Sequence, residues 1–314
     1  MSEPAKALTV SSLRSTAVNS LSTWLYEVGW KVTRALPEPA AEAVFRQMAD
    51  ALWIRGGGGV AQLERNLRRV HPEVTDPQIR ELSRAGMRSY LRYWCEAFRL
   101  PSWSKDRIRE TFVLDRQHLL DEALHEGGAL MIPGHMANWD HAGAWAALTY
   151  GSVTSVAERL KPDRLFEKFL VYRRRLGMDI LGTGDADVMR QLVDRLRDGK
   201  LVALLGDRDI GRTGVHVDFF GEPASFPAGP AILAMMTGVP LHPVSMWFDG
   251  ELCRGYVHDR IEIPAGSDRR ESIAAITQQL ARGWESGIRE HSADWHMLQR
   301  VWVADLVSRE AVAT

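Results

Sequence analysis

The chain has 314 residues, of which 45% are hydrophobic and 25% charged, with 39 Lys and Arg against 40 Asp and Glu. This balance excludes a protein that coats nucleic acid with positive charge, so we expect no nucleic-acid partner, while the length allows a large buried core. Cys95 and Cys253 lie far apart and belong to no Cys-x-x-Cys pair, which excludes a disulfide framework and a zinc-thiolate site and fits a reducing compartment.

The amino-terminal segment from Ser11 to Ala35 predicts an amphipathic helix, because its apolar residues recur at helical spacing and include Trp24 and Trp30. Such a helix either packs on the rest of the domain or lies in the interface of a membrane, and the two roles are compatible. Residues 1–10 lack the basic-then-apolar pattern of a secretory signal, so we expect no export.

A second helical block runs from Ala40 to Leu100, interrupted by four consecutive glycines at 56–59. Because this glycine run follows a predicted helix and not a strand, it indicates a hinge or a helix end and not a phosphate-binding loop. We expect residues 1–110 to form a helical region that packs, as part of one structural unit, on a core of residues 111–314.

From Asp115 onward the sequence changes to short apolar runs that alternate with helical stretches. The runs predicted as buried strands are Ala129–Pro133, Val153–Ala157, Met178–Leu181 and Leu201–Leu205. The helical stretches between them are Trp139–Leu148, Pro162–Leu176 and Ala186–Asp198. This alternation predicts an α/β fold with a mainly parallel central sheet flanked by helices.

The last third of the chain adds further predicted elements. The strands are Val215–Phe220, Leu241–Phe248 and Glu251–Ile263, and the helices are Pro230–Thr237 and Arg270–Arg289. The stretch Pro223–Phe248 contains no charged residue, but its prolines and glycines leave no uninterrupted run near the roughly 20 residues that a membrane span needs. We interpret it as loop, short helix and strand.

The motif that carries chemistry follows the predicted strand Ala129–Pro133. His135 lies in a Pro-Gly turn, Asn138 is placed to cap the next helix, and Asp140 lies in the first turn of that helix. In a parallel α/β sheet this junction lies at the carboxyl edge, where ligands bind. If only Asp140 is helical, its carboxylate can meet the imidazole, which predicts a general base that takes a proton from an alcohol.

Other chemistries have less support. A metal site built from His135, Asp140 and His141 would lack a His-Glu-x-x-His motif and a thiolate pair, so we expect no metal. A serine nucleophile is disfavoured because no Gly-x-Ser-x-Gly elbow is present.

Two further segments are candidates for the site. The turn Asp207-Arg208-Asp209 follows the predicted strand Leu201–Leu205, which favours a place at the carboxyl edge over an internal salt-bridged turn. Phe219 and Phe220 either shape an acyl groove or pack the core.

The spacing of His135 and Asp140 resembles the His-x4-Asp motif of glycerolipid and lipid A type acyltransferases. Further segments resemble one branch of that group, the actinobacterial phosphatidylinositol mannoside acyltransferases. These segments are Met87–Trp94, Gly206–Asp209, Val217–Pro223, Pro227–Ala231 and Asp294–Met297. The resemblance covers nearly the whole chain, with several motifs in family order, and implies a glycerolipid acyltransferase-like fold.

The resemblance implies an acyl-CoA-dependent O-acyltransferase. Its expected reaction moves a long acyl chain, typically palmitoyl, to the 6-hydroxyl of the mannose at inositol position 2 of a phosphatidylinositol mannoside. It implies no cofactor beyond acyl-CoA as co-substrate, and a peripheral location at the cytoplasmic face of the plasma membrane. The 11 tryptophans and the amphipathic amino terminus fit contact with a membrane surface. An acyl carrier protein stays open as the donor.

The resemblance also implies residue roles. His135 matches the family base and Asp140 its partner, and a further acidic residue is expected at Asp207 or Asp209. Glu158 and Arg173 match positions in the family's active-site groove. Together with Arg208, Asn138, Phe219 and Phe220 from the segments described above, Glu158 and Arg173 make up the candidate substrate-binding residues.

Direct attack of a hydroxyl on a thioester needs no acyl-enzyme, but it needs donors for the developing oxyanion. Backbone N–H groups near Gly206 or the side chains of residues 207–209 are candidates. The charge-free stretch Pro223–Phe248 is a candidate wall of the acyl site. Three other functions stay open: acylation of another lipid such as a lysophospholipid, hydrolysis of a lipid or thioester by His135 and Asp140, and lipid binding without catalysis.

Overall fold

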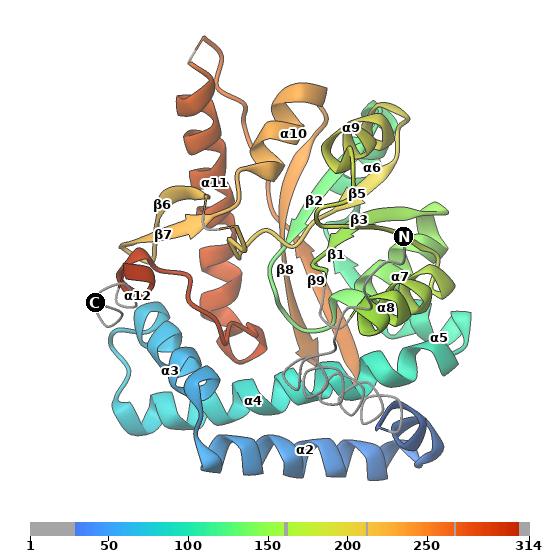
Figure 1. Ribbon diagram of the computed structural model, residues 1–314, viewed down its shortest axis with the longest axis vertical. Helices are drawn as coiled ribbons and strands as arrows, with labels where there is room; N and C mark the ends of the chain where they lie inside the picture. The colour runs from blue at the N-terminus through green and yellow to red at the C-terminus, as the bar shows by residue number, and fades with distance from the viewer. Residues whose placement is uncertain (1–28, 160–162, 212, 267, 308–314) are drawn as a thin grey trace, which may run out of the picture.

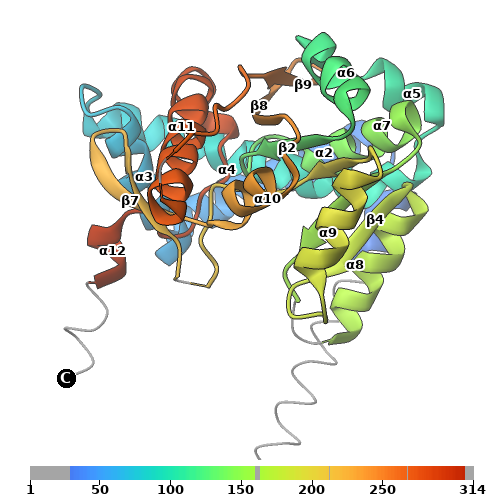
Figure 2. The same ribbon diagram turned by 90° about the horizontal axis from the view of Figure 1, so that it is seen from above.

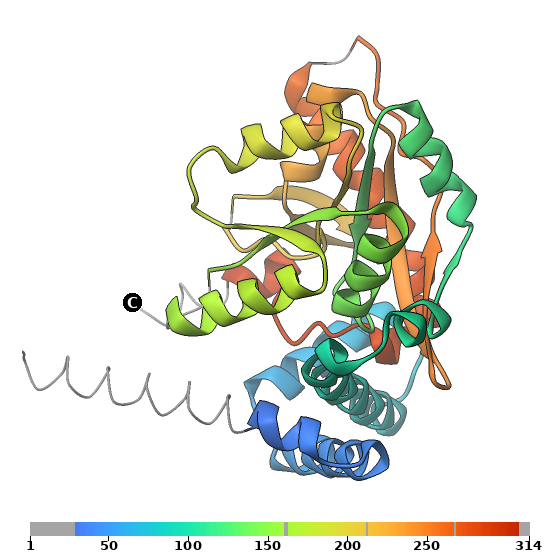
Figure 3. The same cartoon turned by 90° about the vertical axis from the view of Figure 1, so that its right-hand side faces the viewer.

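The computed structural model describes residues 29–159, 163–211, 213–266 and 268–307. It shows an α/β core above a layer of helices (Figure 1). The layer consists of α2 (Glu38–Arg55), α3 (Gly58–Val70), α4 (Asp76–Arg99), η1 (Leu100–Ser102) and α5 (Lys105–Glu110). Its α2, α3 and α4 share an apolar core that includes Phe45, Leu63 and Ile79. Figure 3 shows this layer below the sheet from the side.

Local sequence explains where these helices begin and end. The helix α2 ends at Arg55, and Gly56 follows at φ 59°, a left-handed conformation that glycine adopts without a Cβ clash. The glycine run is therefore a helix break, as predicted. The helix α4 begins with a capping box between Thr75 and Gln78. Of the predicted amphipathic helix, residues 11–28 lie outside the described residues, and residues 29–35 are helical.

The core contains a seven-stranded sheet in the order β1-β9-β8-β2-β5-β3-β4. Its strands are β1 (Phe112–Asp115), β2 (Ala129–Pro133), β3 (Val153–Ala157), β4 (Met178–Gly182), β5 (Leu201–Ala203), β8 (Leu241–Asp249) and β9 (Leu252–Val257). The run from β8 through β2, β5 and β3 to β4 is parallel, whereas β9 pairs antiparallel with β8 and parallel with β1. The predicted α/β fold with a mainly parallel sheet is confirmed.

Helices cover both faces of this sheet. They are α6 (Gln117–Glu126), α7 (Trp139–Tyr150), α8 (Asp163–Arg175), α9 (Val188–Arg197), α10 (Gly229–Thr237) and α11 (Arg269–Glu290). The short η2 (Ser292–Asp294) and α12 (Val303–Val307) follow α11, and α12 packs outside this sheet, against residues 222–226. Figure 2 shows α10 and α11 on one side of the sheet and α6 and α7 on the other. Side chains alternate along β2, so Met131 faces α7, whereas Ile132 lies beside Trp284 of α11.

A separate hairpin joins β6 (Val215–Phe219) to β7 (Glu222–Phe226). Its turn places Phe220 and Gly221 at φ 54° and 81°. The strands β1 and β7 are absent from the sequence prediction because β1 has four residues and β7 contains Pro223, which is disfavoured in strands.

The charge-free stretch Pro223–Phe248 forms most of β7, then α10 and most of β8, as the prediction of a short helix and strand required. Within the described part of the chain, no helix combines the length and apolar character needed to cross a membrane.

Candidate active site

His135 lies at the carboxyl edge of the sheet. Strand β2 ends at Pro133, and the chain turns through His135 before α7 begins at Trp139. Asn138 caps α7, as predicted, because its Oδ1 accepts a hydrogen bond from the His141 N–H at 3.0 Å. The Asn138 side-chain amide also donates to Glu96 of α4 at 2.8 Å. The buried Asn138 is therefore engaged within the fold and holds the turn against α4.

The carboxylate that meets the imidazole belongs to Asp207. Its Oδ1 lies 2.5 Å from His135 Nδ1, and its Oδ2 accepts the backbone N–H of His135 at 2.8 Å. Asp207 is fully buried and follows β5, the hydrogen-bonded neighbour of β2. Because an ionised carboxylate only accepts hydrogen bonds, Nδ1 carries a proton, and in the neutral imidazole Nε2 presents a lone pair.

Asp140 does not pair with His135, contrary to the sequence prediction. Its Oδ1 accepts a hydrogen bond from Arg173 Nε at 2.7 Å, and its Oδ2 accepts one from the Tyr93 hydroxyl at 3.0 Å. Asp140 is helical, as predicted, but α7 directs its carboxylate toward α4 and α8. Local spacing could not identify the true partner, because Asp207 is 72 residues further along the chain.

The Asp140 cluster is a buried ion pair. Burial acts to lower the pKa of the Arg173 guanidinium, but Asp140 and Tyr93 outweigh burial and raise it above its ordinary value. Burial, reinforced by Asp140, raises the pKa of the Tyr93 hydroxyl. Arg173 is thus a permanent cation whose charge is balanced by Asp140, and it ties α8 to α7.

Asp207 is stabilised as an anion in spite of its burial. Burial acts to raise the pKa of its carboxyl, but the His135 imidazole and hydrogen bonds from His135 and Trp295 together lower it below the ordinary value. Trp295 donates its indole N–H to Asp207 Oδ2 at 2.9 Å. The Asp207 carboxylate therefore stays charged and oriented beside the imidazole.

The other polar candidates have partners of their own. Asp209 is engaged with the loop that leads into β6, because its Oδ2 accepts hydrogen bonds from the Gly214 N–H and the Ser225 hydroxyl, both at 2.8 Å. Glu158 and Arg208 are partly exposed and face each other, with Arg208 Nη1 3.5 Å from Glu158 Oε2. Of the two aspartates in the turn, Asp207 is the one in contact with His135.

The two phenylalanine candidates differ in position. Phe219 is fully buried and stacks on Trp302, with ring centroids 5.5 Å apart. Phe220 is half-buried at the hairpin turn, with the guanidinium of Arg289 5.3 Å from its ring centroid. Phe219 packs in the core, and neither ring lines the cavity beneath α7.

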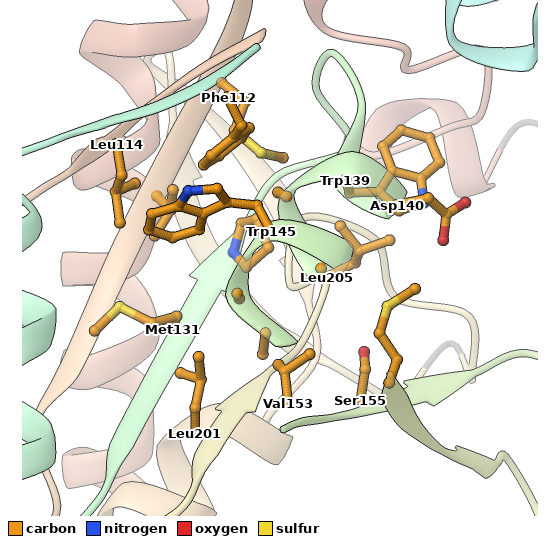
Figure 4. A pocket seen from close by; sticks show the side chains of 18 of the residues that line it. Phe112, Leu114, Met131, Trp139, Asp140, Trp145, Val153, Ser155, Leu201 and Leu205 are labelled. Carbon is orange, nitrogen blue, oxygen red and sulfur yellow. The ribbon is translucent and has the colours of Figure 1, made fainter. Parts of the chain in front are cut away.

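An apolar cavity of about 110 Å³ lies between the sheet and α7. Figure 4 shows Trp139 and Asp140 at one end of it and Leu201 at the other. The ring centroid of Trp139 lies 5.5 Å from that of His135. One indole thus separates the imidazole from an apolar space, an arrangement that suits a polar reaction on the end of a long apolar group.

His141 has a packing role. Its Nε2 lies 3.0 Å from the Ile108 carbonyl oxygen, and burial lowers the pKa of its imidazole to about 4. Among the residues that the structure describes, no three His, Cys, Asp or Glu side chains are grouped as metal ligands would be.

Sequence reasoning missed one part of the site, the segment Asp294–Met297, which lies against the turn that holds His135. The backbone N–H of His296 donates to the His135 carbonyl oxygen at 2.8 Å, and Trp295 contacts Asp207 as described above. This segment is one of those that carry the family resemblance, but its spacing in the sequence gives no sign of contact with a residue so distant along the chain.

Comparisons with known proteins place the chain in a family. Residues 11–304 match the family of bacterial lipid A biosynthesis acyltransferases. The chain belongs to that family. A phosphatidylinositol mannoside acyltransferase of Mycolicibacterium smegmatis is 43% identical to this acyltransferase over 285 residues, which are 90% of this chain and 91% of that protein. Another, of Mycobacterium tuberculosis, is 41% identical over 302 residues, which are 93% and 92% of the two chains. The resemblance drawn from the sequence is confirmed.

Proposed function

We propose that this acyltransferase moves a palmitoyl group from acyl-CoA to the 6-hydroxyl of the mannose at inositol position 2 of a phosphatidylinositol mannoside. The observation that carries the proposal is the His135 imidazole, held through Nδ1 by Asp207 beside an apolar cavity, which leaves Nε2 without a hydrogen-bond partner among the described residues. The names of the relatives support the mannosylated acceptor, because identity above 40% extends over nine tenths of both chains.

The reaction needs one base and no covalent intermediate on the enzyme. His135 Nε2 takes the proton of the sugar hydroxyl as the hydroxyl oxygen attacks the thioester carbonyl carbon. When the tetrahedral intermediate collapses, the carbon–sulfur bond breaks and the same proton passes to the departing sulfur, so CoA leaves as the thiol. The Asp207 carboxylate stabilises the imidazolium between these two steps.

The oxyanion of the intermediate needs a donor at the turn after β5. The backbone N–H of Gly206 is already bonded to the Pro133 carbonyl oxygen at 3.1 Å, so it is not free for this task. Arg208 is only partly exposed and has a long contact with Glu158, which leaves guanidinium hydrogens available. We assign oxyanion stabilisation to Arg208, with Glu158 as the residue that orients it.

The cavity beneath α7 is our proposed site for the acyl chain. Its lining is dominated by apolar side chains such as Met131, Trp145 and Val153. A methylene chain buried there gains about 0.8 kcal/mol for each CH₂ group removed from water. The thioester would then lie at the Trp139 end, within reach of His135.

The helix α2 supports a peripheral location at a membrane surface, which we place at the cytoplasmic face of the plasma membrane. Val44, Met48 and Leu52 repeat every four residues along its outer face and are 43%, 44% and 43% exposed. Arg46 and Arg55 are also exposed on this helix. An apolar stripe with neighbouring cations fits the interface of an anionic bilayer.

The test is an acyl-transfer assay with palmitoyl-CoA and a panel of mannosylated and non-mannosylated phosphoinositides and lysophospholipids. We expect transfer to the mannosylated acceptors, abolished by His135→Gln. The matched control is His118→Gln, because His118 is an exposed histidine on α6, and it should keep wild-type activity.

Each alternative has its own outcome in this assay. Thiol release that needs no acceptor would indicate a thioesterase, and preference for a lysophospholipid would indicate another acceptor. Activity only with an acylated carrier protein would replace acyl-CoA as the donor. Full activity in His135→Gln would refute the base assignment.

A further inference from the structure

The segment Asp294–Met297, named here the tryptophan strap, lies against the turn that carries His135. The backbone N–H of Ala137 donates to the Asp294 carbonyl oxygen at 2.9 Å, and that of His296 donates to the His135 carbonyl oxygen at 2.8 Å. Met136 and Trp295 form an isolated antiparallel bridge. The strap therefore fixes the backbone of the turn on both sides of His135.

The strap also reaches the carboxylate behind the imidazole. Trp295 is fully buried, and its indole N–H donates to Asp207 Oδ2 at 2.9 Å. The same oxygen accepts the backbone N–H of His135, while Oδ1 meets the imidazole. Among the described donors to this buried carboxylate, the indole is the one that His135 does not itself supply.

We infer that Trp295 is a positioning residue of the catalytic pair. Its indole N–H holds the Asp207 carboxylate in the orientation and at the distance at which the carboxylate orients the His135 imidazole. The inference rests on the proposed role of His135 as the base. Trp295 touches neither the substrate nor the reacting atoms in this mechanism, and it acts through Asp207.

The chemical consequence follows from the hydrogen bonds that the carboxylate would lose. Without the indole, the negative charge of Asp207 is less compensated and acts more strongly on the imidazole, which favours the imidazolium. The neutral imidazole, which is the active form of a base, would then be reached only at higher pH. The acid limb of the pH–rate profile should therefore move to higher pH.

The surrounding charges stay in place when the indole is replaced. The charged and titratable groups on the described elements around the turn include Asp207, Asp209, Asp294, His296, Glu96, Tyr93, the Glu158–Arg208 pair and the Asp140–Arg173 pair. Burial lowers the pKa of His296 to about 3, so its imidazole stays neutral across the range of the assay. Burial raises the pKa of the Asp294 carboxyl, which accepts hydrogen bonds from Ser89 and the Phe248 N–H.

The test compares Trp295→Phe with Trp302→Phe in the full chain. Trp302 is the matched control, because it is also fully buried and donates its indole N–H, at 3.0 Å, to the Phe219 carbonyl oxygen and not to Asp207. Each variant loses one buried indole hydrogen bond and keeps an aromatic ring. A role in folding alone would thus lower the stability of both variants alike.

Two readouts are measured, the pH dependence of kcat/KM for acyl transfer and the NMR titration of the His135 imidazole. The His135 signal is assigned by its absence in His135→Gln. In Trp295→Phe we expect the acid limb of the pH profile and the midpoint of the His135 titration to move together to higher pH, by roughly 0.5 to 1 pH unit. We also expect kcat/KM to fall on the order of tenfold. Trp302→Phe should leave both midpoints at their wild-type values.

A midpoint that stays at or below the wild-type value in Trp295→Phe, or the same displacement in both variants, would overturn the inference. The proposed function fails separately. If His135→Gln keeps full activity, the base assignment is refuted, and the role of Trp295 in catalysis falls with it. If His135→Gln is inactive and the Trp295→Phe midpoint does not move, only the positioning role is refuted.

Discussion

Two aspartates near the turn that carries His135 have different partners. Asp207 pairs with His135, whereas Asp140 balances the charge of Arg173 in a contact where the Asp140 side chain is 1% and the Arg173 side chain 17% exposed. Removing one partner of a buried ion pair leaves an uncompensated charge, which costs far more than removing both. This asymmetry allows the role of Asp140 to be tested apart from the chemistry at His135.

We expect Asp140→Asn and Arg173→Met each to lower the free energy of unfolding by about 3 kcal/mol, and the double variant to recover most of the loss. The physical reason is that either single change leaves one buried ion or a poorly satisfied polar group, while the double change removes both charges. Urea unfolding of the four proteins in this double-mutant cycle measures the coupling, which should be about 2 kcal/mol or more.

Additive losses in the cycle would contradict a structural ion pair. The control is a second ion pair, Arg195 with Asp179. Arg195 Nη2 lies 3.0 Å from Asp179 Oδ2, but the two side chains are 46% and 38% exposed. Because solvent screens an exposed pair, Arg195→Met and Asp179→Asn should show little coupling.

At the scale of elements, the sequence predicts most of the core, because periodicity reports directly on burial. The buried run of β2 and the helical pattern of α11 are predicted with ends close to the observed ones. The sequence does not predict the direction of β9 or the order of the strands, because both depend on contacts between distant segments. The same limit explains the site: the turn at His135 is local and was predicted, whereas Asp207 and Trp295 reach it through sheet order and a carboxyl-terminal segment.

The helix α2 has one buried and one exposed apolar face. On one face of α2, apolar side chains are buried against the other helices of the layer, as Phe45 is. On the other face, Val44, Met48 and Leu52 have no described apolar cover. Replacing the stripe should therefore affect binding to a surface and not folding.

We expect the triple variant Val44→Ser, Met48→Ser and Leu52→Ser to bind vesicles containing anionic lipid at least about tenfold more weakly, because burial of these side chains in the interface is worth about 1 kcal/mol each. Vesicle sedimentation measures the binding. The control carries Met236→Ser and Ile263→Ser, which are 48% and 39% exposed outside the helical layer. Equal binding by the wild type and the triple variant would show that α2 is not a membrane contact.

At the scale of the whole molecule, the site lies where separate parts of the fold meet. The sheet supplies His135 and Asp207 from neighbouring strand ends, and α4 lies across that edge and contacts both the turn and the tryptophan strap through Glu96 and Ser89. The apolar cavity extends away from this edge, between the sheet and α7. Trp139 therefore lies between the His135–Asp207 pair and the apolar cavity.

This arrangement predicts that the depth of the cavity limits the acyl chain. Ala146 lines the cavity about two turns into α7, well beyond Trp139. In Ala146→Leu, the added carbons would occupy the space of the distal end of the chain. We expect kcat/KM for palmitoyl-CoA to fall on the order of tenfold and that for octanoyl-CoA to change little, because a short chain ends before the obstruction.

The comparison needs a variant that is overpacked elsewhere. Ala123 of α6 is 1% exposed and does not line the cavity, so Ala123→Leu should lower stability by a similar amount, about 1–3 kcal/mol, without changing the ratio of the two donors. A donor ratio that moves equally in both variants would mean that the loss reflects general destabilisation. A donor ratio that stays fixed in Ala146→Leu would place the acyl chain outside this cavity. The cavity beneath α7 would then be a packing defect of the core without a part in the reaction.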